Sequence, residues 1–259
     1  CHETFKDQQN NWRSPDEVIT NDGKNYFLKS DNSNKVVVGS SESMSKSKKN
    51  TIDPEKIINL YGADAVRLFI LSDSPPEKDV QWSDEGIVSS HKFIQKLWSL
   101  NNKIKDEMAK NHKINTNNKL TKFTNQYLKN MTYNLQTFSY NKLIANLHEM
   151  YSFLNKEISN NYTAKTIEEN YSKILITMIP IIPHFALECI DNNDFKINLT
   201  WPKYSEEILI EENINFVVQI NGKKRALIDT ERDISEENLL KVINNNNNIN
   251  KYFFNKDPQ

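Results

Sequence analysis

The stretch Ser-Met-Ser-Lys-Ser-Lys-Lys-Asn at residues 43–50 decides how this chain is interpreted, because it places three lysines and three hydroxyl groups in one short loop. Just downstream, Asp53 and Pro54 predict the start of a helix. The aspartate can accept a backbone N–H bond as N-cap, and proline fixes the first helical dihedral angle. A helix N-terminus offers unpaired N–H groups and partial positive charge. We therefore expect the loop and the helix start to bind a polyphosphate together.

A short basic loop taken alone is more often simply solvated, so the interpretation depends on what surrounds it. The loop resembles the KMSKS signature of class I aminoacyl-tRNA synthetases. The similarity continues in the same order through residues 50–54, 61–71 and 74–83. The last of these stretches, which reads Ser-Pro-Pro-Glu-Lys-Asp-Val-Gln-Trp-Ser, resembles the bacterial-type leucyl branch more than the valyl and isoleucyl branches.

This resemblance implies a mainly α-helical chain with three parts. Residues 1–72 are expected to be the C-terminal end of a Rossmann-type catalytic domain that carries the KMSKS-like loop. Residues 73–200 are expected to form an α-helical bundle of the anticodon-binding type, and residues 201–259 part of a small α+β C-terminal domain. Because no His-x-Gly-His motif occurs in the sequence, the resemblance also implies a C-terminal portion of such an enzyme, inactive by itself.

The implied reaction is that of a leucine–tRNA ligase: ATP-dependent activation of leucine to leucyl-AMP, followed by transfer to tRNA(Leu). Lys46 is the expected catalytic residue, and Mg²⁺ is implied with ATP, without a metal site in this chain. Ser43 stands where the signature has lysine, and we expect Lys48 and Lys49 to restore the positive potential. The resemblance implies ATP contacts from Ser43, Met44, Ser45, Lys46 and Ser47. Most of the leucine pocket is expected outside these residues.

The formal net charge of −1 means that no global field attracts nucleic acid, so contacts with tRNA must come from local patches. We expect such patches on a helix that follows Ser83 and just after an Asn-Gly hairpin turn. The residues concerned are Lys92, Lys96, Lys223, Lys224 and Arg225. A tRNA-binding module without catalysis and a valyl- or isoleucyl-type fragment remain the alternatives.

The cysteine content and the absence of a long apolar run indicate the compartment in which the chain works. Two cysteines in 259 residues make no disulfide framework, and no apolar run is long enough to span a membrane. These observations favour a cytoplasmic protein, which we expect to be monomeric. Cys189 is expected to pack as a small apolar group, and His184 to serve in the core or as a cap rather than in catalysis.

Hydrophobic periodicity predicts the local structure. Strands are expected at 25–29 and 35–38, with a turn at 31–34. On one predicted helix Val66, Phe69 and Ile70 should face the core, while Asp64 and Arg67 are spaced to pair, the first at the surface and the second beneath the loop. Helices are expected at 54–61, 63–71, 84–108, 120–135, 140–158 and 166–178, and a hairpin at 216–228.

Overall fold

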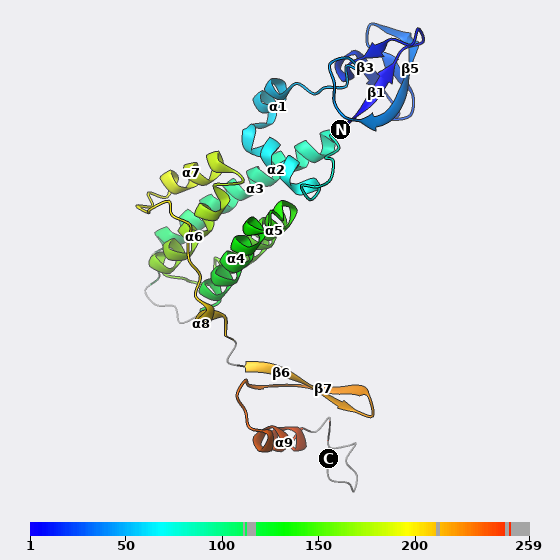
Figure 1. The fold of residues 1–259 in the computed structure, drawn as a ribbon. Coiled ribbons are helices and arrows are strands. Elements are labelled where there is room, and N and C mark those ends of the chain that lie inside the picture. The colour runs from blue at the N-terminus through cyan, green and yellow to red at the C-terminus, as the bar shows by residue number, and fades with distance from the viewer. Residues whose placement is uncertain (111, 113–117, 211–212, 247–248, 250–259) are drawn as a thin grey trace. The chain divides into compact units, whose positions relative to one another are not determined.

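The computed structural model describes residues 1–259 except 111, 113–117, 211–212, 247–248 and 250–259 (Figure 1). The chain forms two compact units, Cys1–Tyr204 and Ser205–Gln259. The elements of the first unit are β1 (His2–Lys6), β2 (Trp12–Arg13), the 3-10 helix η1 (Pro15–Glu17), β3 (Val18–Thr20), β4 (Tyr26–Leu28), β5 (Asp31–Glu42), α1 (Pro54–Tyr61), α2 (Ala63–Asp73), α3 (Asp84–Ala109), α4 (Lys119–Gln136), α5 (Tyr140–Glu157), α6 (Ala164–Met178) and α7 (Pro183–Asn192).

The N-terminal part of this unit is a five-stranded sheet with the strand order β2-β1-β5-β4-β3. Every pairing in it is antiparallel. A small apolar cluster of Phe5, Val18, Leu28 and Val36 holds the strands together. The parallel sheet of a Rossmann-type domain is therefore not seen among the described residues.

The predicted turn at residues 31–34 is wrong. Those residues belong to β5, and the reversal comes earlier, since Leu28 of β4 pairs directly with Asp31 of β5. The side chain of Asp31 accepts hydrogen bonds from the backbone and the hydroxyl of Ser33. The turn-forming residue types of this stretch thus make local bonds without reversing the chain.

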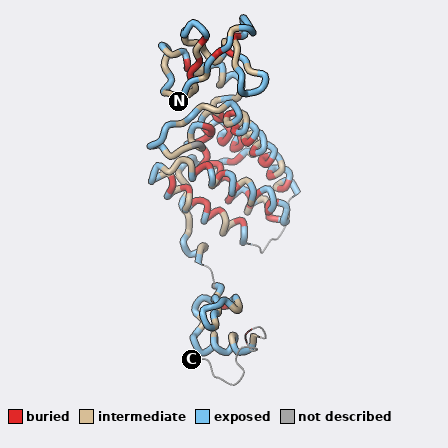
Figure 2. Tube along the Cα trace, turned by 90° about the vertical axis from the view of Figure 1, so that its right-hand side faces the viewer, coloured by how far each residue is buried: buried red, intermediate tan, exposed pale blue. Residues whose placement is uncertain are grey.

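The helices from α2 to α7 share one large core. Apolar residues three and four positions apart give each helix a buried stripe. Figure 2 shows such stripes as buried positions that recur along the helices of this unit. Ile104 of α3, Met131 of α4, Leu147 of α5 and Ile174 of α6 are fully buried in the same cluster. The predicted helices agree with the observed ones to within two residues at either end.

The buried face of α2 differs from the prediction. Ala65, Leu68 and Phe69 are buried, whereas Ile70 is 48% exposed. Because α2 packs against both α3 and α5, its contact stripe runs through positions 65, 68 and 69. Of the residues expected in the core, only Phe69 is fully buried. The observed buried stripe is shifted by about one residue from the predicted one.

The predicted pairing of Asp64 with Arg67 is also wrong, and their environments are reversed. Asp64 is only 7% exposed and binds the start of α7. Arg67 is exposed, and its guanidinium donates to the carbonyl oxygens of Ile181 and Pro180, at 2.8 and 2.6 Å. Both residues therefore join α2 to the segment around α7 rather than to each other.

The second unit contains α8 (Glu206–Leu209), β6 (Asn213–Ile220), β7 (Lys223–Glu231) and α9 (Glu236–Asn244). The two strands form an antiparallel hairpin. Its turn residues Asn221 and Gly222 both have positive φ, 53° and 73°, as a type I′ turn requires. The hairpin predicted from the Asn-Gly pair is therefore confirmed.

Candidate functional site

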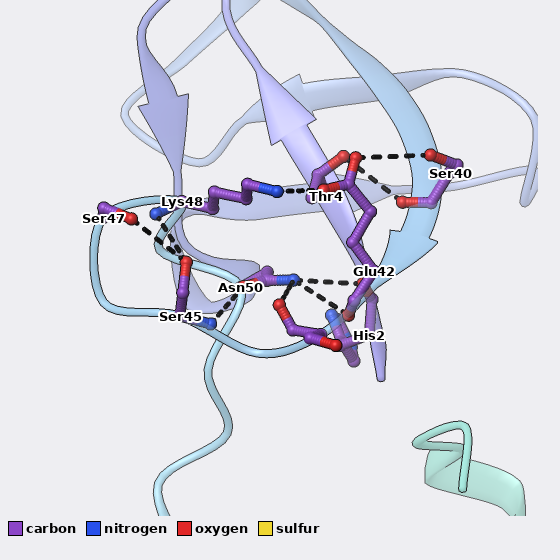
Figure 3. Close-up of polar contacts among 9 residues, drawn as sticks. His2, Thr4, Ser40, Glu42, Ser45, Ser47, Lys48 and Asn50 are labelled. Carbon is purple, nitrogen blue, oxygen red and sulfur yellow. Dashed lines mark hydrogen bonds and ion pairs between the residues drawn. The ribbon is translucent and has the colours of Figure 1, made fainter. Parts of the chain in front are cut away.

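The loop that follows β5 is fastened at its base by Asn50, a fully buried residue (Figure 3). Its side-chain oxygen accepts a hydrogen bond from the backbone N–H of Ser45 at 2.8 Å. Its amide nitrogen lies 3.2 Å from the carbonyl oxygen of His2 and 3.4 Å from those of Glu42 and Ser43. One side chain thus ties both ends of the loop to β1 and β5.

The hydroxyl groups of the loop form a small network above this base. The Ser45 and Ser47 hydroxyl oxygens lie 3.1 Å apart, and the backbone N–H of Lys48 donates to Ser45 Oγ at 3.3 Å. Ser43, Met44 and Ser47 are exposed, while Ser45 is half-buried. Ser45 therefore orders the loop, and the other three present their side chains to solvent.

The three lysines of the loop have different surroundings. Lys48 forms an ion pair with Glu42, and this hydrogen-bonded contact lowers the pKa of the glutamate. Lys49 adopts the left-handed conformation with φ of 53°. Hydrogen bonds from Ser14 lower the pKa of Glu17, and the charge of Lys49 contributes to the same shift. Lys48 is therefore paired with a carboxylate, whereas Lys49 acts on Glu17 through its charge and makes no ion pair with it.

Lys46 differs from Lys48. It is exposed, and its ammonium group makes no hydrogen bond or ion pair with any residue that the structure describes. The expectation that Lys48 compensates for Ser43 is accordingly not supported, because Glu42 already neutralises that charge. Lys46 therefore keeps its charge available to a ligand, as does Lys49, which likewise makes no ion pair within the described part of the chain.

A cavity of about 790 Å³ lies beside Lys46. Lys29 and Lys56 also line it, and Lys56 pairs with Asp16 at 2.7 Å. The N-terminus of α1 forms another wall, where Asp53 accepts a bond from the N–H of Glu55 at 3.0 Å as N-cap. Ammonium groups around a helix N-terminus suit a multiply charged anion such as a triphosphate. The carboxylates in the wall offset part of this positive charge.

The residues expected to contact tRNA lie in both units. Lys92 and Lys96 are exposed on α3. Burial, reinforced by the charge of Lys96, lowers the pKa of His148 on α5, whose ring stacks on Phe93 with centroids 3.8 Å apart. In the second unit Lys223 and Lys224 are exposed at the start of β7, and Arg225 is half-buried at a β-bulge. The roles of all five residues stay predictions.

Sequence reasoning missed two residues that organise the loop. Asn50 is only one position of the stretch that carries the family resemblance, and no sequence pattern distinguishes Glu42. An asparagine at the end of a polar loop carries no distinctive pattern, since its role depends on the strands that surround it.

In the part of the chain that the structure describes, no three histidine, cysteine or acidic side chains gather into a possible metal site. Nor is any described helix long and apolar enough to cross a bilayer.

Comparison with known proteins gives the family. Residues 34–83 match the family model of class I tRNA synthetases (I, L, M and V), and residues 117–242 match that of the anticodon-binding domain of tRNA ligase. The chain is 37% identical to the leucine–tRNA ligase of Orientia tsutsugamushi (strain Boryong), over 99% of this chain and 30% of the relative. For the Rickettsia typhi ligase the identity is 38%, over 99% of this chain and 31% of the relative.

A solved structure shares the fold. It is the ternary complex of Agrobacterium radiobacter K84 LeuRS with tRNA and LeuAMS, with a TM-score of 0.70 and 20% identity over 84% of this chain and 29% of that one. The chain thus spans about 30% of the length of the curated relatives that it matches. Those relatives are leucine–tRNA ligases, which disfavours a valyl or isoleucyl assignment. The chain is thus homologous along its whole length to part of the leucine–tRNA ligases, and two of its segments match the class I tRNA synthetase and anticodon-binding family models.

Proposed function

We propose that this chain serves the leucine–tRNA ligase reaction, in which leucine is activated by ATP and then transferred to tRNA(Leu). Its part in that reaction is to supply the loop that closes on the phosphates of ATP and the helices that bind tRNA. Homology to leucine–tRNA ligases over the whole chain supports this proposal. We expect the 259 residues alone to bind tRNA without charging it, because they correspond to only about 30% of the relatives.

The observation that carries the proposal is the uncommitted ammonium group of Lys46 beside the cavity at the start of α1. In the first step an oxygen of the leucine carboxylate attacks the α-phosphorus of ATP. The bond from that phosphorus to its bridging oxygen breaks, and pyrophosphate leaves with the electron pair. A positioned cation that neutralises charge on the departing pyrophosphate lowers this barrier, by about a hundred- to a thousandfold in rate for comparable donors.

The other loop residues act by holding Lys46 in place. Asn50 fixes the base of the loop, and the hydroxyl network of Ser45 and Ser47 shapes its turn. Ser43, Met44, Ser45 and Ser47 are the proposed neighbours of bound ATP. Mg²⁺ would arrive with ATP as its counter-ion. No side chain of this chain is required as a general base, since a carboxylate is already the nucleophile.

In the second step a hydroxyl oxygen of the terminal ribose of tRNA attacks the acyl carbon of leucyl-AMP. The bond from that carbon to the phosphate oxygen breaks, and AMP leaves with the electron pair while the hydroxyl proton passes to the departing phosphate or to solvent. Holding the tRNA is the proposed role of the helical bundle and of the second unit. Exposed lysines at phosphate-contact positions add affinity without reading sequence. We assign this role to Lys92, Lys96, Lys223, Lys224 and Arg225. We further propose that the protein acts as a monomer in the cytoplasm, with most of the leucine pocket formed by residues outside this chain.

A chimeric ligase tests the proposal. Residues 1–259 would replace the homologous 30% of the Orientia tsutsugamushi ligase, and charging of tRNA(Leu) with leucine would be measured. The same ligase with that segment deleted is the negative control. We expect the chimera to charge tRNA(Leu). A folded chimera that binds leucine and ATP yet forms no leucyl-adenylate would contradict the proposal.

A further inference from the structure

The corner between α4 and α5 exposes an aromatic residue on a strained backbone. Phe138 has φ of 54° and is 62% exposed. Its N–H bonds to the carbonyl oxygen of Leu135 at 3.2 Å, and the N–H of Ser139 bonds to that of Asn134 at 2.8 Å. These two bonds make the corner a Schellman turn with Phe138 at the left-handed position. Glycine usually occupies that position because a Cβ atom strains it.

Most other left-handed positions among the described residues follow the usual preference. Six non-glycine residues among those described have positive φ, and four of them are asparagine or aspartate: Asn10, Asn161, Asp194 and Asn221. The two exceptions are Lys49, in the candidate phosphate-binding loop, and Phe138. A bulky exposed residue in this conformation costs stability and gains little burial, so its presence indicates a function.

Two further aromatic residues surround this corner. Tyr133, in the last turn of α4, is 63% exposed. The rings of Phe138 and Tyr140 meet edge to face, with centroids 6.1 Å apart. The corner therefore offers flat apolar rings to solvent at the end of a helix.

A basic stripe leads along α4 to these rings. We use this name for Lys119, Lys122, Gln126, Lys129 and Tyr133, which follow one another at spacings of three and four residues and so share one helix face. None of the five is buried. The opposite face of α4 packs into the core through Leu128 and Met131. At 1.5 Å per residue the stripe is about 20 Å long.

The sequence around the stripe contains no negative charge. Between Glu107 and Glu149 there is no aspartate or glutamate, in a chain whose formal net charge is −1. The same interval contains six lysines, Lys110, Lys113, Lys119, Lys122, Lys129 and Lys142, of which Lys110 pairs with Glu107 at 2.8 Å. This local excess of positive charge complements a polyanion, whereas an apolar protein partner would not require it.

We infer that the basic stripe and Phe138 form an RNA-binding surface, on which phosphates lie along α4 and an unpaired nucleobase stacks on the phenylalanine ring. Unpaired bases in RNA loops are commonly stacked on aromatic side chains, and lysines along a groove or helix hold the backbone. The inference rests on the proposed function in taking this RNA to be a loop of the bound tRNA.

Binding of tRNA(Leu) to the 259-residue chain tests the inference. In Phe138→Gly the left-handed backbone is kept and the ring is removed, so we expect the urea midpoint of unfolding to stay equal or rise. The dissociation constant for tRNA should increase roughly 5- to 150-fold, which is the range for loss of one stacked base. Phe138→Trp should retain binding. Asn161→Gly, the same kind of backbone change at another corner, is the matched control and should leave binding unchanged.

Two more measurements separate stacking from charge. Lys122→Gln should reduce the slope of log Kd against log salt concentration by about one, without changing the effect of Phe138→Gly. A single-stranded RNA should bind Phe138→Gly more weakly than the unaltered chain, whereas an abasic strand of equal length should bind both equally.

The outcomes are distinct from those of the chimeric ligase. The inference is overturned if Phe138→Gly binds tRNA as tightly as the unaltered chain, or if the unaltered chain binds no RNA. This holds whether or not the chimeric ligase charges tRNA(Leu). Loss of self-association in Phe138→Gly with unchanged RNA binding would also overturn it, since the corner would then contact protein. Charging by the chimera decides the proposed function separately.

Discussion

The carboxylate of Asp64 caps α7, a helix that begins at Pro183: its Oδ2 atom accepts a hydrogen bond at 2.7 Å from the backbone N–H of Phe185, which lies 121 residues later in the sequence. Its other oxygen lies 2.9 Å from Nδ1 of His184. Because α7 starts at Pro183 and its N-cap residue Ile182 offers no side-chain acceptor, Asp64 satisfies an N–H group at that helix start. The cap thus joins α2 to α7, the last helix of the bundle.

We predict that Asp64→Ala lowers the free energy of unfolding by about 1–3 kcal/mol, because it leaves a buried N–H group without its acceptor. Urea denaturation followed by circular dichroism would measure the change. Asp106→Ala, at an exposed position of α3, should alter stability by less than about 0.5 kcal/mol. Equal effects of the two substitutions would refute the capping role.

Asn50→Ala should loosen the candidate loop more than any other single change in it. The substitution removes the acceptor of the Ser45 N–H and leaves three carbonyl oxygens without their donor. Hydrogen exchange of the Ser45 amide should quicken by about tenfold or more, as expected for loss of a buried hydrogen-bonded group. Asn32→Ala, at an exposed position of β5, serves as control and should leave that amide unchanged.

The ion pair of Lys48 with Glu42 makes the loop sensitive to acid. Because the pair lowers the pKa of Glu42 below its ordinary value of 4.5, its stabilisation is fully present above pH 4.5. The stabilisation is lost as the pH falls through the lowered pKa of the folded state. Amide resonances of residues 45–48 should therefore shift in an NMR titration below pH 4.5. In Glu42→Gln they should already have their low-pH positions at pH 7, and an unaltered titration in that variant would contradict the pairing.

Cys189 should be unreactive in the folded chain. Its side chain is fully buried, and burial raises the pKa of the thiol to about 12 from an ordinary value of 9.0. The folded state therefore disfavours the thiolate, so this group destabilises the fold as the pH rises from about 9 toward 12. Iodoacetamide at pH 8 should modify Cys1 in native protein and both cysteines in urea. Rapid labelling of Cys189 under native conditions would rule out this burial.

Sequence patterns predicted the helices closely, because each has a long apolar stripe and several have recognisable caps, such as Asp53 and Ser83. The buried face of α2 differs from the predicted one, because the apolar residues of a short helix that contacts two neighbours do not show which of its faces is buried. Asp64 was misplaced because its partners, His184 and Phe185, lie more than 100 residues away. For the same reason the pattern of the loop identified Lys46 as a candidate but gave no sign of Asn50 at its base.

Pyrophosphate exchange by the chimeric ligase with Lys46→Ala tests the central claim most directly. If the Lys46 ammonium group neutralises the departing pyrophosphate, kcat should fall about a hundred- to a thousandfold, while the KM for leucine changes little. Lys46→Arg should recover part of the rate, because it keeps the charge with a different geometry. An exchange rate equal to that of the unaltered chimera would contradict the claim and remove Lys46 from the reaction.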